Sequence, residues 1–407
     1  MLVLEILFWL SAALIVWTQL GYALALAVLA RFTAPAAEPS SQAEGASLQR
    51  TQRSPARGGA PSSSLPVSSS PPLLSLIVAA HDEQSVIAAK VANVLALDYP
   101  RELLELIVAC DGCSDATAER ARAAGADVVL ELPRGGKIRA QDAAVRGARG
   151  EIVAFSDANA QWERSAARAL VGAFVDPRVG YACGQVRFVQ AARGVVATNQ
   201  EGLYWRYEMA VRSLESRLRS ITAGNGAIYA TRREAYLEVD PIMGHDLSFP
   251  FNMVKRGWRA VYVPAARAEE KMVPSIEGEF ARKRRMMSHT WPIVLRGGML
   301  SPRGYGLGYG LMILSHRILR YATPALHAVA LLANLLLVLD GAAVLYAVTL
   351  ALQLALLAAA ALGGSLRARP LLLARYYVLT TVSLAAGLWD WLRHGTDAAW
   401  DVAEGTR

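Results

Sequence analysis

Cysteine is scarce in this chain: its 407 residues include only three, Cys110, Cys113 and Cys183. A small, odd number argues against a disulfide framework and is typical of a reducing compartment. Cys110 and Cys113 form a CxxC pair, but a zinc site normally takes four ligands and no second pair exists. The sequence therefore does not favour metal or redox use of this pair. The first strand-like run also lacks a GxGxxG turn, which argues against a standard dinucleotide site.

Charged residues are also few. They make up 19% of the chain, against 54% for hydrophobic residues, and this balance indicates membrane spans rather than a purely soluble protein. The formal net charge is +8, yet the chain has no recognisable nucleic-acid-binding signature. Arg and Lys lie beside apolar segments, as on the cytoplasmic face of a membrane protein. We therefore expect contact with membrane lipid and no nucleic-acid partner.

A retained membrane anchor is predicted at the start, in residues 1–31. Leu7–Ala30 is nearly uninterrupted in its apolar character and long enough to cross a bilayer. It lacks the basic start and the short apolar core of a cleaved signal peptide. Arg31 follows it, which places the amino end outside and the next segment in the cytoplasm. Residues 32–72, rich in Ser, Ala, Pro and Gly, are predicted to form a disordered linker.

The region 301–392 is predicted to hold about three more transmembrane helices. The candidate spans are Leu319–Leu339, Ala342–Leu362 and Leu371–Leu388. Arginines flank the second connection, which agrees with a cytoplasmic position for it and for the middle domain. Three spans after a cytoplasmic middle domain leave the tail, residues 393–407, outside. An interfacial third helix would instead leave the tail in the cytoplasm. The expected location is a multi-pass protein of the plasma (inner) membrane.

The middle region, residues 73–300, alternates strand-like and helix-like segments. We expect strands at Leu74–Ala80, Leu104–Ala109, Asp127–Leu130, Ile152–Phe155 and Ala260–Val263, and helices at Ser85–Leu97, Ala116–Ala124, Ala140–Ala148 and Tyr204–Leu218. Repeated β-α-β units predict a Rossmann-like α/β fold, a mainly parallel sheet with helices on both faces. A basic amphipathic segment, Glu279–Trp291, is expected at the membrane interface.

Acidic residues follow several of these predicted strands. Glu83, Asp111 and Asp157 come just after three of them, and parallel strands end at one edge of a sheet, where ligands bind. Asp157 and Asn159 project the same way from an extended backbone and could hold a hard divalent cation with a diphosphate. An Asx turn is the alternative for this pair. Lys137 follows two glycines and precedes a helix, which suits a phosphate or a plain surface turn.

These motifs together resemble those of inverting family 2 glycosyltransferases with a GT-A fold. SLIVAAHDEQ at Ser75–Gln84 is similar to the family's opening strand and loop, and ACDGCSDAT at Ala109–Thr117 to its DDGSxD loop. Gly135–Asn159 resembles the GK-helix-strand-DxD segment, and GHD at Gly244–Asp246 the acidic acceptor-side motif. The likeness covers roughly Leu73–Trp291 in this order and spacing. Enzymes of this family often carry flanking membrane helices.

The resemblance implies a role for each matching residue. Glu83, Asp111 and the backbone near Ala80 would contact the nucleoside, and Lys137 would sit near the nucleotide. Asp157 and Asn159 would bind Mg²⁺ or Mn²⁺ with the donor diphosphate. Asp246 would be the general base, with His245 orienting it or the acceptor. Arg285 would reach the leaving diphosphate.

Three positions depart from the family pattern. Asn159 stands where the second Asp of DxD is usual, which lowers the charge available to a metal. Cys110 replaces the first Asp of DDGSxD. Arg282–Met286 reads RKRRM where processive synthases carry QxxRW, so Arg285 is kept but the glutamine and tryptophan are not. This weakens the case for a polymerase that holds a growing chain on an aromatic platform.

The sequence thus predicts a membrane-bound, metal-assisted, inverting glycosyltransferase with a cytoplasmic catalytic domain. It would transfer a sugar from a nucleotide-sugar donor, UDP-linked by preference, to a hydroxyl of a lipid-linked or cell-surface glycan. The alternative within the enzyme class is a processive polysaccharide synthase. The alternative from another class is a non-catalytic membrane scaffold with a degenerate glycosyltransferase fold. The oligomeric state is not readable from the sequence.

Overall fold

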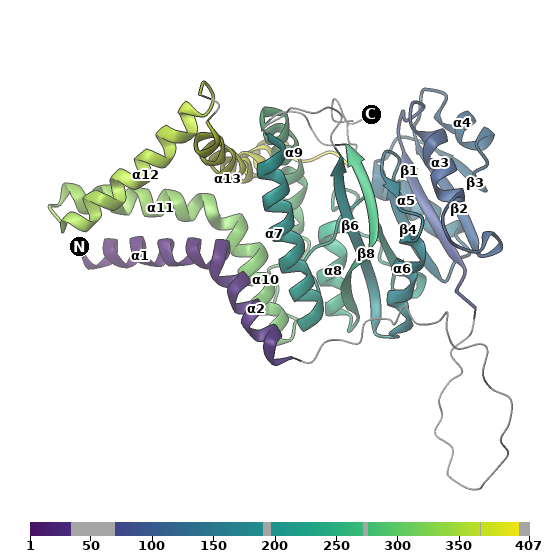
Figure 1. Cartoon of the computed structure of the whole chain (residues 1–407), viewed down its shortest axis with the longest axis horizontal. Coiled ribbons are helices and arrows are strands. Elements are labelled where there is room, and N and C mark those ends of the chain that lie inside the picture. The colour runs from purple at the N-terminus through teal and green to yellow at the C-terminus, as the bar shows by residue number, and fades with distance from the viewer. Residues whose placement is uncertain (34–69, 190–196, 272–275, 367, 399–407) are drawn as a thin grey trace, which may run out of the picture.

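The structure is a computed structural model that describes residues 1–33, 70–189, 197–271, 276–366 and 368–398. The predicted linker, residues 32–72, lies almost entirely outside the described residues. The described chain forms an α/β domain and a helical arm that projects from it (Figure 1). The arm begins with a bent helix made of α1 (Leu2–Val16), a π-helical turn (Trp17–Gly21) and α2 (Tyr22–Phe32).

One mixed sheet, with strand order β3-β2-β1-β4-β7-β6-β8-β5, forms the centre of the domain. Its strands are β1 (Leu74–Ala80), β2 (Leu104–Asp111), β3 (Val128–Leu132), β4 (Ile152–Asp157), β5 (Gln161–Trp162), β6 (Val179–Val189), β7 (Tyr229–Arg232) and β8 (Arg259–Lys271). The strands β3, β2, β1 and β4 are parallel, as predicted. β7 is antiparallel to β4 and to β6, which makes the sheet mixed. The carboxyl ends of β1, β2 and β4 therefore share one edge.

Helices cover both faces of the sheet, which confirms the predicted layering. Their bounds are α3 (Ile87–Leu95), α4 (Thr117–Ala123), α5 (Lys137–Gly147), α6 (Ala166–Gly172), α7 (Ala197–Leu218), α8 (His245–Lys255) and α9 (Ile276–Leu295). Leu76 and Val78 of β1 pack with α3, α4 and α6 on one face, whereas Ile77 packs with α5, α7 and α8 on the other. Because both faces are covered, every residue of β1 is buried and the strand reads as one apolar run.

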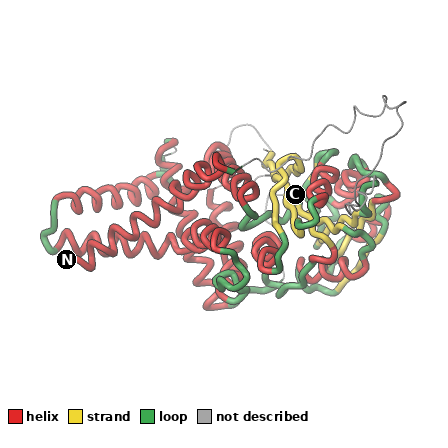
Figure 2. The backbone as a smooth tube through the Cα atoms, turned by 90° about the horizontal axis from the view of Figure 1, so that it is seen from below, coloured by secondary structure: helices red, strands yellow, loops and turns green. Residues whose placement is uncertain are grey.

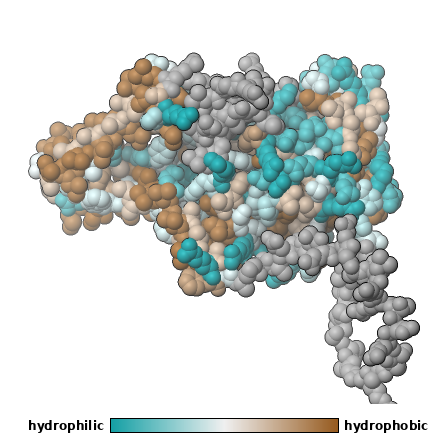
Figure 3. All heavy atoms as spheres, viewed as in Figure 1, coloured by the Kyte–Doolittle hydropathy of each residue, from teal (hydrophilic) through white to brown (hydrophobic). Residues whose placement is uncertain are grey.

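The arm continues after the domain with α10 (Leu307–Ile313), α11 (Leu319–Leu339), α12 (Val344–Leu362) and α13 (Arg369–His394). Four helical segments of the described chain are long and apolar enough to cross a membrane: Leu2–Phe32, Leu307–Leu339, Val344–Leu362 and Arg369–His394. α1 packs along α11, and the long helices of the arm lie side by side in two views (Figures 1 and 2). Apolar surface gathers on the arm and polar surface on the domain (Figure 3).

The carboxyl-terminal helix contacts the α/β domain. α13 packs along α9 of that domain. The Thr396 hydroxyl donates to the Ser288 carbonyl at 2.8 Å, and a methyl group on Gly136 would overlap the Ala398 carbonyl. The segment after α13 therefore stays on the domain. These contacts favour the interfacial alternative for the third helix, and the side of the membrane on which the tail lies stays a prediction.

A buried polar cluster joins the arm to the domain. The Glu215 carboxylate of α7 accepts from the Tyr22 hydroxyl of α2 at 2.7 Å and lies 2.7 Å from His316 Nδ1 in the turn before α11. It also accepts from the Thr222 backbone N–H at 3.0 Å, and Arg317 Nε donates to the Thr222 hydroxyl at 2.8 Å. Thr222 begins the loop that leads to β7 and the site below. The helices of the arm thus hold the start of that loop.

Candidate active site

The centre of the site is an ion pair between the Lys137 ammonium and the Asp157 carboxylate. Asp157 ends β4 and Lys137 is the first residue of α5, so the fold brings both to the carboxyl edge of the sheet. Burial alone would lower the pKa of Lys137, but the adjacent Asp157 carboxylate outweighs burial and the pKa is raised. The ammonium is therefore a fixed positive charge.

Gly226 forms the wall beside this pair. A Cβ built on it would lie 3.3 Å from Lys137 Nζ and 3.8 Å from an Asp157 carboxylate oxygen. The turn that holds Gly226 is organised by Asn225, whose side-chain oxygen accepts from the Ile228 N–H at 2.9 Å and whose amide donates to the Gly184 carbonyl at 2.7 Å. A side chain at position 226 would fill the space next to the ion pair.

Asp246 lies in the first turn of α8, close enough to Lys137 for their charges to interact. Its carboxylate is half-buried and folds back onto Gly244, where a Cβ would approach it to 2.6 Å. Its backbone carbonyl accepts from the Gly224 N–H at 2.6 Å, which fixes it to the loop of Gly226. Burial raises the pKa of Asp246, and the Lys137 charge offsets part of that rise. The charges of Asp157 and Asp246 thus both act on the Lys137 ammonium.

Two charged residues that sequence reasoning missed belong to the same cluster. Burial and the Asp157 charge raise the pKa of Glu270, on β8, to about 7. Lys90 of α3 is fully buried, donates to the Ala160 carbonyl at 2.6 Å, and has its pKa lowered by burial to about 7. The alternating pattern of β8 shows an acidic residue at Glu270 but not that it faces Asp157. The sheet order brings Glu270 there, because β8 lies between β6 and β5, and β5 follows Asp157 in the chain.

Asp111 lies in a neighbouring pocket at the end of β2. Its buried carboxylate accepts from the backbone N–H groups of Gly135, at 2.6 Å, and Gly136, at 3.0 Å, and pairs with Arg134 at 3.4 Å. Gly136 has a φ of 94°, a conformation that glycine adopts without strain. Asp111 therefore ties the loop before Lys137 to the sheet edge, next to the ion pair.

Glu83 and Ala80 flank the same pocket from β1. Glu83 is 5% exposed, and its backbone N–H donates to the Thr117 hydroxyl at 2.8 Å. Ala80 is the last residue of β1 and pairs with Cys110 of β2 in the parallel ladder. The structure thus brings Ala80, Glu83 and Asp111 to one stretch of the edge, as the resemblance implied.

His245 faces the core rather than the open site. Its ring is 2% exposed, stacks on Phe249 with centroids 3.9 Å apart, and meets Phe155 edge-on. Its Nδ1 lies 2.8 Å from the Tyr229 hydroxyl. Burial lowers the pKa of His245 well below its ordinary value. A neutral, enclosed ring fits the orienting role that the sequence suggested, because it fixes the start of α8 next to Asp246.

Asn159 and Arg285 complete the set of predicted residues. Asn159 is half-buried, two residues after Asp157 in the turn that follows β4. Arg285 is exposed on α9, and the structure does not bring it into the Lys137–Asp157 cluster. Arg282, one turn earlier, pairs with Glu279 at 2.7 Å and contributes to the electrostatics of Glu270. The predicted contact of Arg285 with the leaving diphosphate stays a prediction.

A divalent cation fits the residues around Asp157. The ligands there are oxygens, a carboxylate and an amide carbonyl, which Mg²⁺ and Mn²⁺ prefer. The Lys137 ammonium already rests against the carboxylate, which shows that the position attracts positive charge. Gly226 leaves space beside it that a side chain would fill.

Comparison with known proteins agrees with this geometry. The family model described as glycosyltransferase like family 2 matches residues 71–288. The chain belongs to this family. It is therefore a glycosyltransferase, and the matched range spans β1 to α9, including every predicted site residue. No curated protein matches the chain.

One solved structure shows the same fold, and a second is similar over about half of the chain. A mannosyltransferase from Pyrobaculum calidifontis, in complex with GDP-mannose and Mn²⁺, is 21% identical, with a TM-score of 0.68, and the match covers 95% of this chain and 99% of that one. Glucosyl-3-phosphoglycerate synthase from Mycobacterium tuberculosis, with Mn²⁺ and UDP, is 20% identical over 54% of this chain and 78% of that chain, with a TM-score of 0.38. The first likeness shows that the glycosyltransferase has a GT-A-like fold.

Proposed function

We propose that this glycosyltransferase is an inverting enzyme of the plasma membrane. It transfers one sugar from a nucleotide-sugar donor to a hydroxyl of a lipid-linked or cell-surface glycan, with the catalytic domain in the cytoplasm. The observation that carries the proposal is the Lys137–Asp157 ion pair at the carboxyl edge of the sheet, with Asp246 close enough for its charge to act on Lys137. Asp157 suits the donor diphosphate, and Asp246 suits the acceptor hydroxyl.

The donor side would be served by Asp157, Asn159 and Lys137. Asp157 and Asn159 would hold Mg²⁺ or Mn²⁺, which supplies positive charge to the departing nucleoside diphosphate. Lys137 stands at the amino end of the 11-residue helix α5, where backbone N–H groups and the helix dipole also favour phosphate. The Lys137 ammonium would release Asp157 to the cation and pair with a phosphate oxygen instead.

Asp246 would act as the general base. Its half-buried carboxylate is close enough to Lys137 for their charges to interact, so a hydroxyl bound against it would lie near the donor side. Taking the hydroxyl proton as the oxygen attacks from the face opposite the leaving group inverts the anomeric centre. Burial holds the Asp246 pKa above that of an ordinary carboxyl, which makes it a stronger base.

The nucleoside would lie against Glu83 and Asp111. The sequence favours a UDP-linked donor. The Pyrobaculum structure contains GDP-mannose, which is therefore the second donor to test. The apolar arm supports a lipid-linked acceptor, because it would hold the active site close to the bilayer. The absent QxxRW motif disfavours processive synthesis.

Donor turnover tests the proposal directly. Full-length protein in native membranes is offered a panel of UDP- and GDP-sugars with Mg²⁺ or Mn²⁺, with acceptor lipids present. Nucleoside diphosphate release with one donor is expected, and Asp246→Asn and Asp157→Ala should each lower it at least about a hundredfold. Asp98→Asn is the matched control, because Asp98 is exposed and pairs with Arg168 after α3, away from the site.

The product and the variants separate the alternatives. A single sugar added per acceptor supports the proposal, whereas a ladder of products would support a processive synthase. If no donor is turned over by protein that still binds nucleotide, the non-catalytic scaffold is the better reading. Full activity of Asp246→Asn would show that Asp246 is not the general base.

A further inference from the structure

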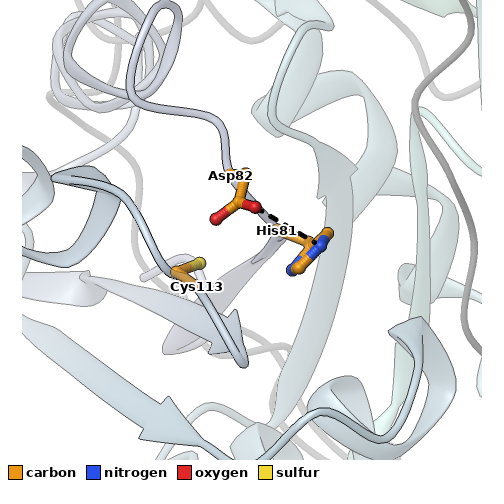
Figure 4. A group of neighbouring side chains, drawn as sticks. All are labelled: His81, Asp82 and Cys113. Atoms are coloured by element: carbon orange, nitrogen blue, oxygen red, sulfur yellow. Dashed lines mark ion pairs between the residues drawn. The ribbon is translucent and has the colours of Figure 1, made fainter.

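Two loops meet beside the nucleoside pocket, one after β1 and one after β2. They bring together His81, Asp82 and Cys113 (Figure 4). One ligand atom from each of the three residues lies within 4.8 Å of the other two. The proposed function uses none of these side chains.

The ring of His81 is oriented as a metal ligand. Its Nδ1 lies 2.8 Å from the Asp111 backbone carbonyl, which can only accept, so Nδ1 carries the proton. The lone pair is then on Nε2, which faces an Asp82 carboxylate oxygen at 3.6 Å. Metal-binding histidines commonly donate their other N–H to a backbone carbonyl in this way. A cation between His81 Nε2 and the Asp82 carboxylate oxygen would be bound by both acceptors.

Asp82 is also held from outside the cluster. One of its carboxylate oxygens accepts from the Ser114 backbone N–H at 2.8 Å, and the other lies 3.2 Å from the Ser114 hydroxyl. Asp82 has a φ of 50°, the only non-glycine residue of the described chain with a positive φ. This backbone directs the carboxylate toward His81 and Cys113.

Cys113 supplies a sulfur ligand. Its thiol is half-buried and donates to the Ala80 carbonyl at 3.5 Å. The thiolate is the form that binds metals, so metal binding at this site would release the thiol proton.

We propose that His81, Asp82 and Cys113 form a zinc-binding site. A nitrogen, a thiolate and a carboxylate match Zn²⁺, whereas Mg²⁺ and Mn²⁺ prefer oxygen alone. In a tetrahedral zinc site neighbouring ligand atoms are about 3.5 Å apart. The His81–Asp82 separation of 3.6 Å already meets this, and the widest separation, at most 4.8 Å, needs a rotamer adjustment of Cys113.

The site is separate from the catalytic cation site at Asp157, and it does not depend on the proposed sugar transfer. Three protein ligands leave a fourth position for water. The ion would cross-link the loop after β1 to the loop after β2. It would also fix the His81 ring, which is bonded to the Asp111 carbonyl, and thereby stiffen one wall of the nucleoside pocket.

Cobalt binding reports on the sulfur ligand. Full-length protein in detergent, with any affinity tag removed and Mg²⁺ in excess, is titrated with Co²⁺ as a substitute for Zn²⁺. We expect one sulfur-to-cobalt charge-transfer band per chain, displaced by Zn²⁺. Cys113→Ser should abolish the band, and His81→Gln and Asp82→Asn should weaken cobalt binding at least about tenfold. Zn²⁺ should raise the Tm of the wild-type protein and not that of Cys113→Ser.

Matched variants identify the ligands. Cys183→Ser removes a buried thiol elsewhere in the domain, and His394→Gln an exposed imidazole on α13; both should leave cobalt binding unchanged. Binding that survives in His81→Gln but is lost in Cys110→Ser would assign the ion to the CxxC pair and overturn the proposal. Absence of a charge-transfer band in folded wild-type protein, checked by its thermal transition, would do the same.

Discussion

The general base proposed at Asp246 would make the activity sensitive to mild acid. Such a base works only when it is ionised, and burial holds the Asp246 pKa above the ordinary carboxyl range. As the pH falls through this raised pKa, the proton-accepting form is lost, so kcat/KM should fall at a pH above about 4, where an exposed carboxylate would still be ionised. The measurement is a pH profile of kcat/KM with saturating metal.

The control for this profile is thermal stability over the same range. A transition temperature that stays constant while kcat/KM falls assigns the loss to the active site. A profile that is flat down to about pH 4 would show that no group with a raised pKa limits the reaction.

Gly226 is the residue that keeps the ion pair accessible. A valine there would bring methyl groups against Lys137 and Asp157, because even a Cβ lies 3.3 Å from the ammonium. We expect Gly226→Val to lower kcat/KM at least about tenfold, equivalent to about 1.4 kcal/mol, with the fold kept. Gly172→Ala is the control, since a Cβ at Gly172 meets no other atom within 4 Å. Equal activity of the two variants would show that the space beside the pair is not used.

At the scale of elements, the contact between α7 and the arm includes two buried carboxylates, Glu208 and Glu215. Glu215→Ala removes the acceptor for Tyr22, Thr222 and the His316 ring. Leaving buried polar groups without their acceptor costs about 3 kcal/mol, so the Tm in detergent should fall by several degrees. Glu102→Ala, an exposed carboxylate, should change stability by no more than about 0.5 kcal/mol. A Tm unaffected by Glu215→Ala would mean that apolar packing alone holds the arm.

The predictable elements are those whose pattern is local. The run Leu74–Ala80 matches β1 at both ends, since a strand buried on both faces is apolar throughout. β6, by contrast, was missed: Gly180 and Gly184 interrupt its pattern, and a Cβ on Gly180 would lie 2.8 Å from Trp258. Glycine is required there by a neighbour far along the chain, and no local pattern shows this.

At the scale of the whole molecule, the site residues that strand order brings together could be predicted from the sequence. Those that side-chain packing brings together could not. Parallel strands end at one edge, so Asp111 and Asp157 could be placed together from the order of the strands. Glu270 could not, because β8 reaches the site through its pairing with β6 and with the two-residue strand β5. The path from His316 through Glu215 to Thr222 was equally hidden, since His316 and Glu215 are 101 positions apart in the sequence.

The bonded tail gives a prediction for the topology of the entire chain. With α13 along α9, the turn at Asp340 and the tail at Arg393 belong on opposite sides of the membrane. In sealed spheroplasts an impermeant maleimide should label Asp340→Cys, whereas Arg393→Cys should react only after permeabilisation. The parent protein, with its natural cysteines, gives the background. Labelling of Arg393→Cys in sealed spheroplasts would place α13 across the bilayer, and the bond between Thr396 and Ser288 could not then form.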